Sequence, residues 1–213
     1  MADFASLRAR MVERQLRGHG IEDERVLAAL GAVPREAFVP ARQRHRAYAD
    51  SALPLARGQT ISQPWIVAAI CQALELRGEE RVLEVGTGSG YSAAVLARLA
   101  AEVVSIERHG SLALAAREAL AKLGVANVEL AVGDGSLGVP ERAPFAAIAV
   151  HAAAPAVPPA LIEQLAEGGR LVIPINQDGE TDLLTLLRRR SDGVETESLG
   201  PCRFVPLLGE EGF

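Results

Sequence analysis

One stretch of the sequence joins a strand pattern to a glycine loop, and it is well suited to bind a ligand. The apolar run 81–85 leads into Gly86, Gly88 and Gly90, and a helical pattern begins at Tyr91. Because glycine has no side chain, such a loop can turn tightly and lie close to a ligand. A dinucleotide loop would have glycine at position 91. The spacing therefore favours a nucleoside without a pyrophosphate, and S-adenosylmethionine is the common ligand of that kind; a tight turn that binds nothing is the alternative.

Acidic residues stand at the ends of three predicted strands. Glu84 ends the strand before the glycine loop, Glu107 ends the next strand, and Asp134 follows the third. In a parallel sheet these ends meet at one edge, where ligands bind. Glu107 is placed to accept both ribose hydroxyls, and Asp134 to accept the exocyclic amine of adenine. Taken singly, Glu107 could be a helix-entry carboxylate and Asp134 a turn residue, but the three together favour a nucleoside site.

The elements that must position these residues alternate between strands and helices. This alternation predicts an α/β fold with a doubly wound, mostly parallel sheet covered on both faces. Two antiparallel strands, 182–189 and 194–205, are expected at the end, joined by a turn at 191–193. The predicted helices are 4–17, 23–30, 64–74, 91–99, 112–123 and 158–165, and the predicted parallel strands are 81–85, 102–106, 128–132, 145–150 and 170–175.

A chain of 213 residues is expected to form a single domain with three parts. Residues 1–63 are predicted as N-terminal helices followed by a long irregular loop, 41–63, placed where a lid would be. Residues 64–175 form the α/β core, and residues 176–213 form the C-terminal antiparallel strands.

Composition argues against several other classes. A formal net charge of −5 implies no general attraction to nucleic acid. The longest apolar stretch, 146–162, is interrupted by His151 and prolines, so no membrane span is expected. Cys71 and Cys202 are too few for a disulfide framework, and no zinc-ligand spacing occurs. We expect a cytoplasmic monomer that holds no metal.

A second motif, Gly58-Gln59-Thr60-Ile61-Ser62-Gln63-Pro64-Trp65, makes the chain resemble the protein-L-isoaspartate O-methyltransferase family. The Thr-Ile-Ser-x-Pro element is specific to that family, whereas many methyltransferases share the glycine loop. The resemblance covers nearly the whole chain. It also rests on Gln15-Leu16, Gly20-Ile21, Val33-Pro34-Arg35, Phe38-Val39-Pro40, Ala47-Tyr48-Ala49-Asp50, Gly133-Asp134-Gly135, Ala152-Ala153-Ala154-Pro155 and Arg203-Phe204-Val205-Pro206-Leu207.

The resemblance implies a Rossmann-like class I methyltransferase and a defined reaction. The methyl group of S-adenosylmethionine would pass to the free α-carboxylate of an L-isoaspartyl residue in a damaged protein or peptide. The ester would then collapse to a succinimide, which starts repair. Because a carboxyl group with a pKa of about 4 is already ionised at neutral pH, no strong general base is required. The enzyme must align the reacting atoms and exclude water.

The resemblance also implies roles for particular residues. Ser62 matches the family's active-site serine and is expected to orient the acceptor carboxylate; without the resemblance, its hydroxyl would be assigned to the backbone near Pro64. The expected substrate-binding residues are Ser62, His151, Val205 and Pro206. The expected cofactor-binding residues are Ile61, Gln63, Pro64, Glu84, Gly86, Thr87, Gly88, Ser89, Gly90, Glu107, Arg108, Asp134 and Gly135.

Three positions depart from the family's usual pattern. Ala56 replaces glycine, Ala146 replaces aspartate, and His151 replaces threonine. A histidine at this strand end could donate to a carboxylate, narrow the pocket or select another acceptor. The departures keep two alternatives open: a methyltransferase of the same fold acting on another carboxylate or a peptide natural product, and a non-catalytic protein that binds the cofactor. Tyr91 disfavours a nucleotide oxidoreductase, and the acidic balance with no Asn-Pro-Pro-Tyr motif disfavours an RNA methyltransferase.

Overall fold

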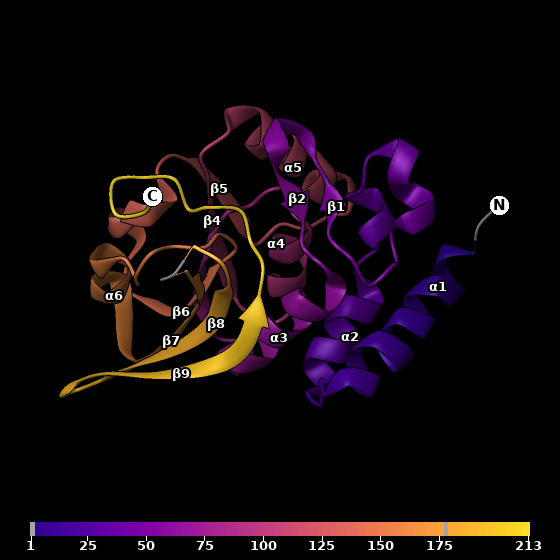
Figure 1. The fold of residues 1–213 in the computed structure, drawn as a ribbon. Helices are drawn as coiled ribbons and strands as arrows, with labels where there is room; N and C mark the ends of the chain where they lie inside the picture. Colours follow the sequence, from indigo (N-terminus) through magenta and orange to yellow (C-terminus); the bar gives the residue numbers. More distant parts are fainter. Residues whose placement is uncertain (1–2, 177–178) are drawn as a thin grey trace.

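A seven-stranded sheet forms the centre of the molecule in the computed structural model, which describes residues 3–176 and 179–213 (Figure 1). The strand order is β5-β4-β3-β6-β7-β8-β9. Strands β3 to β7 pair in parallel, while β8 and β9 pair antiparallel. The strands are β3 Arg81–Val85, β4 Glu102–Glu107, β5 Val128–Val132, β6 Phe145–Val150, β7 Leu165–Ile175, β8 Asp182–Arg190 and β9 Gly193–Cys202. The predicted α/β fold with a terminal antiparallel hairpin is confirmed.

Helices cover both faces of this sheet. Val82 and Leu83 are consecutive on β3 but belong to different buried clusters, because side chains alternate between the two faces of a strand. One cluster also contains buried side chains of the N-terminal helices, and the other contains Leu161 of α6. The helices are α1 Phe4–Arg10, α2 Glu24–Ala32, α3 Pro64–Leu74, α4 Tyr91–Leu96, α5 Gly110–Lys122 and α6 Pro159–Gln164.

The first predicted helix is not a uniform α-helix. After α1, the chain continues as a π-helical turn, Met11–Leu16, and a 3₁₀ turn, Arg17–His19. A π-helix has i→i+5 hydrogen bonds, so residues five apart lie on nearly the same side. Met11 and Leu16 are five apart and both are fully buried. The wider turn therefore keeps both side chains in the core.

The segment 41–63 was predicted to be irregular, and this is wrong in part. It contains 3₁₀ turns at Ala41–Arg46 and Ala56–Gly58. It also forms a two-stranded antiparallel sheet from β1 Leu53–Pro54 and β2 Thr60–Ile61. Strands of two residues are too short to show an alternating pattern in the sequence. The small sheet holds the chain just before Ser62 in an extended conformation.

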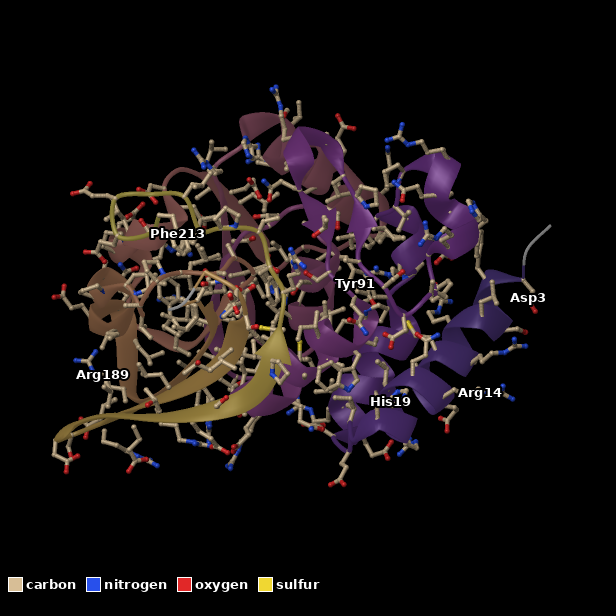
Figure 2. All side chains as sticks on the ribbon, viewed as in Figure 1. Asp3, Arg14, His19, Tyr91, Arg189 and Phe213 are labelled. Atoms are coloured by element: carbon tan, nitrogen blue, oxygen red, sulfur yellow. The ribbon has the colours of Figure 1, made fainter. Side chains whose placement is uncertain are left out.

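A buried arginine connects the N-terminal segment to the core. Arg35 is fully buried, and its guanidinium carbon lies 5.0 Å from the centroid of the Tyr91 ring. Its Nε donates to the carbonyl of Ala47 at 2.7 Å. Burial lowers the pKa of Arg35 to about 10, so the side chain is still a cation at neutral pH. Figure 2 shows Tyr91 in the interior, well inside Asp3 and Arg14 on the outer surface of the N-terminal helices.

The C-terminal tail leaves the sheet earlier than predicted. β9 ends at Cys202 instead of continuing to Val205. The tail then runs beside Ala153, whose N–H donates to Val205 O at 2.8 Å and whose carbonyl accepts from Leu207 N at 2.7 Å. This pairing returns the tail to the carboxyl end of β6 (Figure 1).

Replacing Leu83 by alanine is expected to lower the free energy of unfolding by about 2–5 kcal/mol, because removal of a buried side chain leaves a cavity. Leu83 is fully buried on the central strand β3. Urea denaturation followed by circular dichroism measures the change. The matched control is Leu114→Ala on α5, where the leucine is 59% exposed; there the change should stay within about 0.5 kcal/mol. Equal losses in both variants would contradict this core.

Candidate functional site

A cavity lies at the carboxyl ends of β3, β4 and β6. β4 lies on one side of β3 and β6 on the other, and this reversal of strand order leaves a crevice in doubly wound sheets. The walls come from β2, the glycine loop, the strand ends and the C-terminal tail. The predicted site residues on these walls are Ile61, Ser62, Gly86, Thr87, Gly88, Ser89, Glu107, Arg108, Gly135, His151, Val205 and Pro206.

The glycine loop adopts a backbone that other residues rarely tolerate. Gly86 has φ +93° and Gly88 has φ +53°, both in the left-handed region. A Cβ atom at Gly86 would lie 3.5 Å from the Cβ atom of His151. The loop therefore passes close to the end of β6 and exposes its backbone to the cavity.

Glu107 closes the same loop from the neighbouring strand. Its carboxylate accepts hydrogen bonds from Gly88 N and His109 N, each at 2.9 Å. A carboxylate has about four lone-pair positions, so two remain for a ligand in the cavity. Two acceptor positions at a strand end fit the neighbouring hydroxyls of a ribose. The predicted nucleoside therefore fits the residues present.

Ser62 also lines the cavity, and its hydroxyl has no hydrogen bond within the described part of the chain. The helix α3 that follows has no side-chain cap at Gln63. The alternative role for Ser62, a bond to the backbone near Pro64, is thus not observed. The hydroxyl is available to a ligand.

Three predicted contact residues support the cavity from outside its walls. Gln63 and Pro64 begin α3, and Pro64 is buried. Gly90 precedes α4 with φ +85°, and a Cβ atom there would lie 3.1 Å from the Cβ of Ala116. Gly90 thus allows α4 and α5 to pack closely.

Asp134 lies beside the cavity but not among the residues that line it, and its contact with adenine stays a prediction. Its carboxylate accepts from Ser136 N at 2.9 Å, from Ser136 Oγ at 2.7 Å and from Glu210 N at 2.8 Å. Burial alone would raise the pKa of Asp134, but these hydrogen bonds lower it below its usual value. The carboxylate binds the C-terminal tail, and only the neighbouring Gly135 reaches the wall.

Glu84 also lies off the cavity wall, and its contact with the cofactor stays a prediction. The side chain is fully buried beneath the glycine loop. Its Oε2 accepts from Ser105 Oγ at 2.5 Å, and Ser105 Oγ lies 2.5 Å from Thr87 Oγ1. Burial raises the pKa of Glu84 to about 8, despite the Ser105 and Ser92 hydroxyls that oppose the shift. Glu84 is therefore uncharged at neutral pH and supports the loop through Thr87.

His151 lies on the wall beside Gly86. Its Nε2 is 2.7 Å from Ser92 Oγ and 3.5 Å from Glu84 Oε1. Burial lowers the pKa of His151 to about 4, so the ring is neutral at pH 7. Its Nδ1 is buried and has no hydrogen-bond partner in the described structure.

Several residues on the cavity wall were not predicted from the sequence. Thr60 and Ser92 each lie within or beside a recognised motif, so their positions offered a signal. Leu208 follows the last motif and offered none. These residues reach the cavity only because the small β1–β2 sheet and the C-terminal tail fold back onto the glycine loop.

Within residues 3–176 and 179–213, no cluster of three or more His, Cys, Asp or Glu side chains is arranged to hold a metal ion. The helices of these two ranges are also too short or too polar to cross a membrane.

Comparison with known proteins assigns this arrangement to a family. The family model for protein-L-isoaspartate(D-aspartate) O-methyltransferase (PCMT) matches residues 7–212. Protein-L-isoaspartate O-methyltransferase 1 of Rhodopseudomonas palustris (strain HaA2) is 55% identical over 211 residues, which cover 99% of this chain and 86% of that protein. The protein-L-isoaspartate O-methyltransferase of Methylorubrum populi is 58% identical over 208 residues, covering 98% of this chain and 97% of that protein.

Solved structures agree with this assignment. A protein-L-isoaspartate O-methyltransferase matches with a TM-score of 0.88 at 30% identity, covering 96% of this chain and 67% of that chain. A Plasmodium falciparum protein, provisionally named as the same enzyme and solved with S-adenosyl-L-homocysteine, matches with a TM-score of 0.81 at 26% identity. That match covers 99% of this chain and 100% of the other.

Replacing Glu107 by glutamine is expected to weaken S-adenosylhomocysteine binding by about 10–100-fold, because a hydrogen bond to a charged group contributes about 1.5–3 kcal/mol. Isothermal titration calorimetry measures the dissociation constant. The control is Glu118→Gln on the exposed side of α5, which should leave the dissociation constant unchanged. Unchanged affinity in Glu107→Gln would show that Glu107 does not bind the ribose.

Proposed function

Because the chain belongs to the protein-L-isoaspartate(D-aspartate) O-methyltransferase family, we propose that it methylates the free α-carboxylate of L-isoaspartyl residues in damaged proteins and peptides. The observation that carries this proposal is one cavity in which Ser62 faces the glycine loop and Glu107. The methyl ester formed in this way collapses to a succinimide, which begins repair.

The glycine loop and Glu107 form the cofactor end of the cavity. Glu107 would hold the ribose, while Gly86 to Ser89, Ile61, Arg108 and Gly135 would surround the rest of the molecule. When bound, S-adenosylmethionine supplies an electrophilic methyl group. The apolar side chains of Val67, Ile106 and Leu207 line the same cavity and limit the access of water.

The substrate end is formed by Ser62, His151 and the C-terminal tail. The Ser62 hydroxyl can donate a hydrogen bond to one oxygen of the acceptor carboxylate, which is already ionised at neutral pH. The other oxygen then remains free to attack. Within the described chain, Val205 N and Pro206 O make no backbone hydrogen bond, and they are suited to align the main chain of an extended peptide.

We also propose that the enzyme works as a cytoplasmic monomer. Cys71 and Cys202 are unpaired, which agrees with a reducing compartment.

A synthetic peptide containing L-isoaspartate is expected to take up labelled methyl from S-adenosylmethionine, because the cavity joins a carboxylate-orienting serine to the cofactor end. The same peptide with normal L-aspartate should remain unlabelled. Base-labile methyl incorporation measures the reaction. If neither peptide is labelled while S-adenosylhomocysteine binds, the acceptor is a different carboxylate or the chain is a non-catalytic binding protein.

Replacing Ser62 by alanine is expected to lower kcat/KM for the isoaspartyl peptide by about 10–100-fold, because a hydrogen bond to the reacting carboxylate is lost. Affinity for S-adenosylhomocysteine should change less than about twofold, since the serine acts on the acceptor. Initial rates and calorimetry give the two values. Ser198→Ala on the exposed surface of β9 is the control. Wild-type kcat/KM in Ser62→Ala would exclude this role.

A further inference from the structure

Three polar side chains from three different elements converge behind the glycine loop. Glu84 lies on β3, Ser92 on α4, and His151 just after β6. Ser92 Oγ is 2.7 Å from His151 Nε2, and Glu84 Oε1 is 3.5 Å from the same nitrogen. The Glu84 side chain is fully buried and the His151 side chain is 6% exposed. The group therefore connects the centre of the sheet with the cavity wall.

The positions of the protons follow from the charges and partners of these groups. Burial raises the pKa of Glu84 to about 8, so the carboxyl group carries a proton at pH 7. Oε2 lies 2.5 Å from Ser105 Oγ, whereas Oε1 is buried with no hydrogen-bond partner in the described structure. We therefore assign the proton to Oε1, on the side of Ser92 and His151. With that proton directed toward Nε2 of His151, we assign Nε2 as the acceptor of the Ser92 hydroxyl, which lies 2.7 Å away. Because the ring is neutral, its single proton lies on Nδ1.

This Nδ1 has no partner inside the described protein, although it is buried. A buried donor without an acceptor is unfavourable by about 1–3 kcal/mol, and native structures contain few of them. Since His151 lines the cavity, the group that can reach this ring from solution is one that enters the cavity. A ligand in the cavity that accepts a hydrogen bond would satisfy this N–H.

We propose that Glu84 and Ser92 position His151 as a neutral hydrogen-bond donor to the methyl-accepting carboxylate, which it would share with Ser62. This inference rests on the proposed function. A neutral donor orients a carboxylate without the strong ion pairing that would reduce its reactivity. A protonated imidazole would also repel the positively charged sulfonium of a bound cofactor. Glu84 and Ser92 are positioning residues, because they act through His151.

The other titratable groups near Glu84, Ser92 and His151 do not donate a proton to this group. Glu107 lies on β4 and acts on Glu84 only through its charge, which raises the pKa of Glu84 further. Cys71, on α3, is buried, and burial raises the pKa of its thiol, so it is neutral. As the pH rises through about 8, Glu84 ionises. Its carboxylate then requires a donor, which moves the His151 proton from Nδ1 to Nε2 and removes the donor from the cavity.

Two substitutions at His151 distinguish the roles of its two ring nitrogens. The amide of asparagine reaches the place of Nδ1, whereas the longer glutamine side chain reaches the place of Nε2. We expect His151→Asn to keep a kcat/KM for the isoaspartyl peptide at least tenfold above that of His151→Gln. S-adenosylhomocysteine affinity should be similar in the two variants, which calorimetry checks. Equal kcat/KM values in the two variants, with an active wild type, would overturn the inference.

The tautomer can be measured in the free protein. A ¹⁵N-detected imidazole spectrum of the wild type should show His151 with its proton on Nδ1, identified by its loss in His151→Asn. In Ser92→Ala the proton should redistribute between the nitrogens, while Ser111→Ala, a serine on the exposed side of α5, leaves the spectrum unchanged. A wild-type ring protonated on Nε2 would overturn the inference independently of any assay.

The pH profile gives the last test. Wild-type kcat/KM should fall above a pH of about 8. This decrease should be absent in Glu84→Gln, because the amide of glutamine donates a hydrogen bond at every pH. If kcat/KM of Glu84→Gln still falls above this pH, the proposed role of Glu84 is contradicted. A wild type that fails to methylate the isoaspartyl peptide would overturn the proposed function and this inference together, whereas an active wild type with the wrong tautomer overturns the inference alone.

Discussion

A carboxyl group buried in the middle of the parallel sheet constrains the whole ligand-binding edge. Moving an ionised carboxylate away from water is unfavourable by several kcal/mol, so Glu84 must be neutral and hydrogen-bonded. Its partner Ser105 comes from β4 and holds Thr87 of the glycine loop. Its other oxygen faces His151 after β6. The register of three strands and the position of the loop therefore depend on one fully buried side chain.

Contacts between segments far apart in the sequence complete the cavity next to Glu84. The β1–β2 sheet brings Ser62 to one wall, and the pairing of the tail with Ala153 brings Val205 and Pro206 to another. Asp134 holds the last residues of the tail through Glu210 N. The substrate end thus consists of segments far apart in the sequence. Backbone hydrogen bonds hold the β1–β2 sheet and the pairing with Ala153, whereas the last residues of the tail depend on the Asp134 carboxylate.

Much of the fold could be predicted, because it follows from local patterns. The apolar strands, the alternating helices and the 191–193 turn all appear in the sequence, and the structure contains each of them. Predicted element ends were less accurate, as at β7, which begins at Leu165, and β9, which ends at Cys202. Where a strand ends is set by the neighbour with which it pairs, and that neighbour is not visible in a local pattern.

The residue types by themselves determined the glycine loop, the acid that ends β4 and the serine before α3, because each function needs that chemistry at that distance from a strand or helix end. Only the tertiary structure decided which carboxylates reach a ligand. Glu84, Glu107 and Asp134 look equivalent in sequence, since all stand at strand ends. Packing buries the first beneath the loop, leaves the second on the cavity wall and pairs the third with the C-terminal tail. A side chain's partners depend on elements brought together from distant parts of the chain, and a single sequence does not contain those distances.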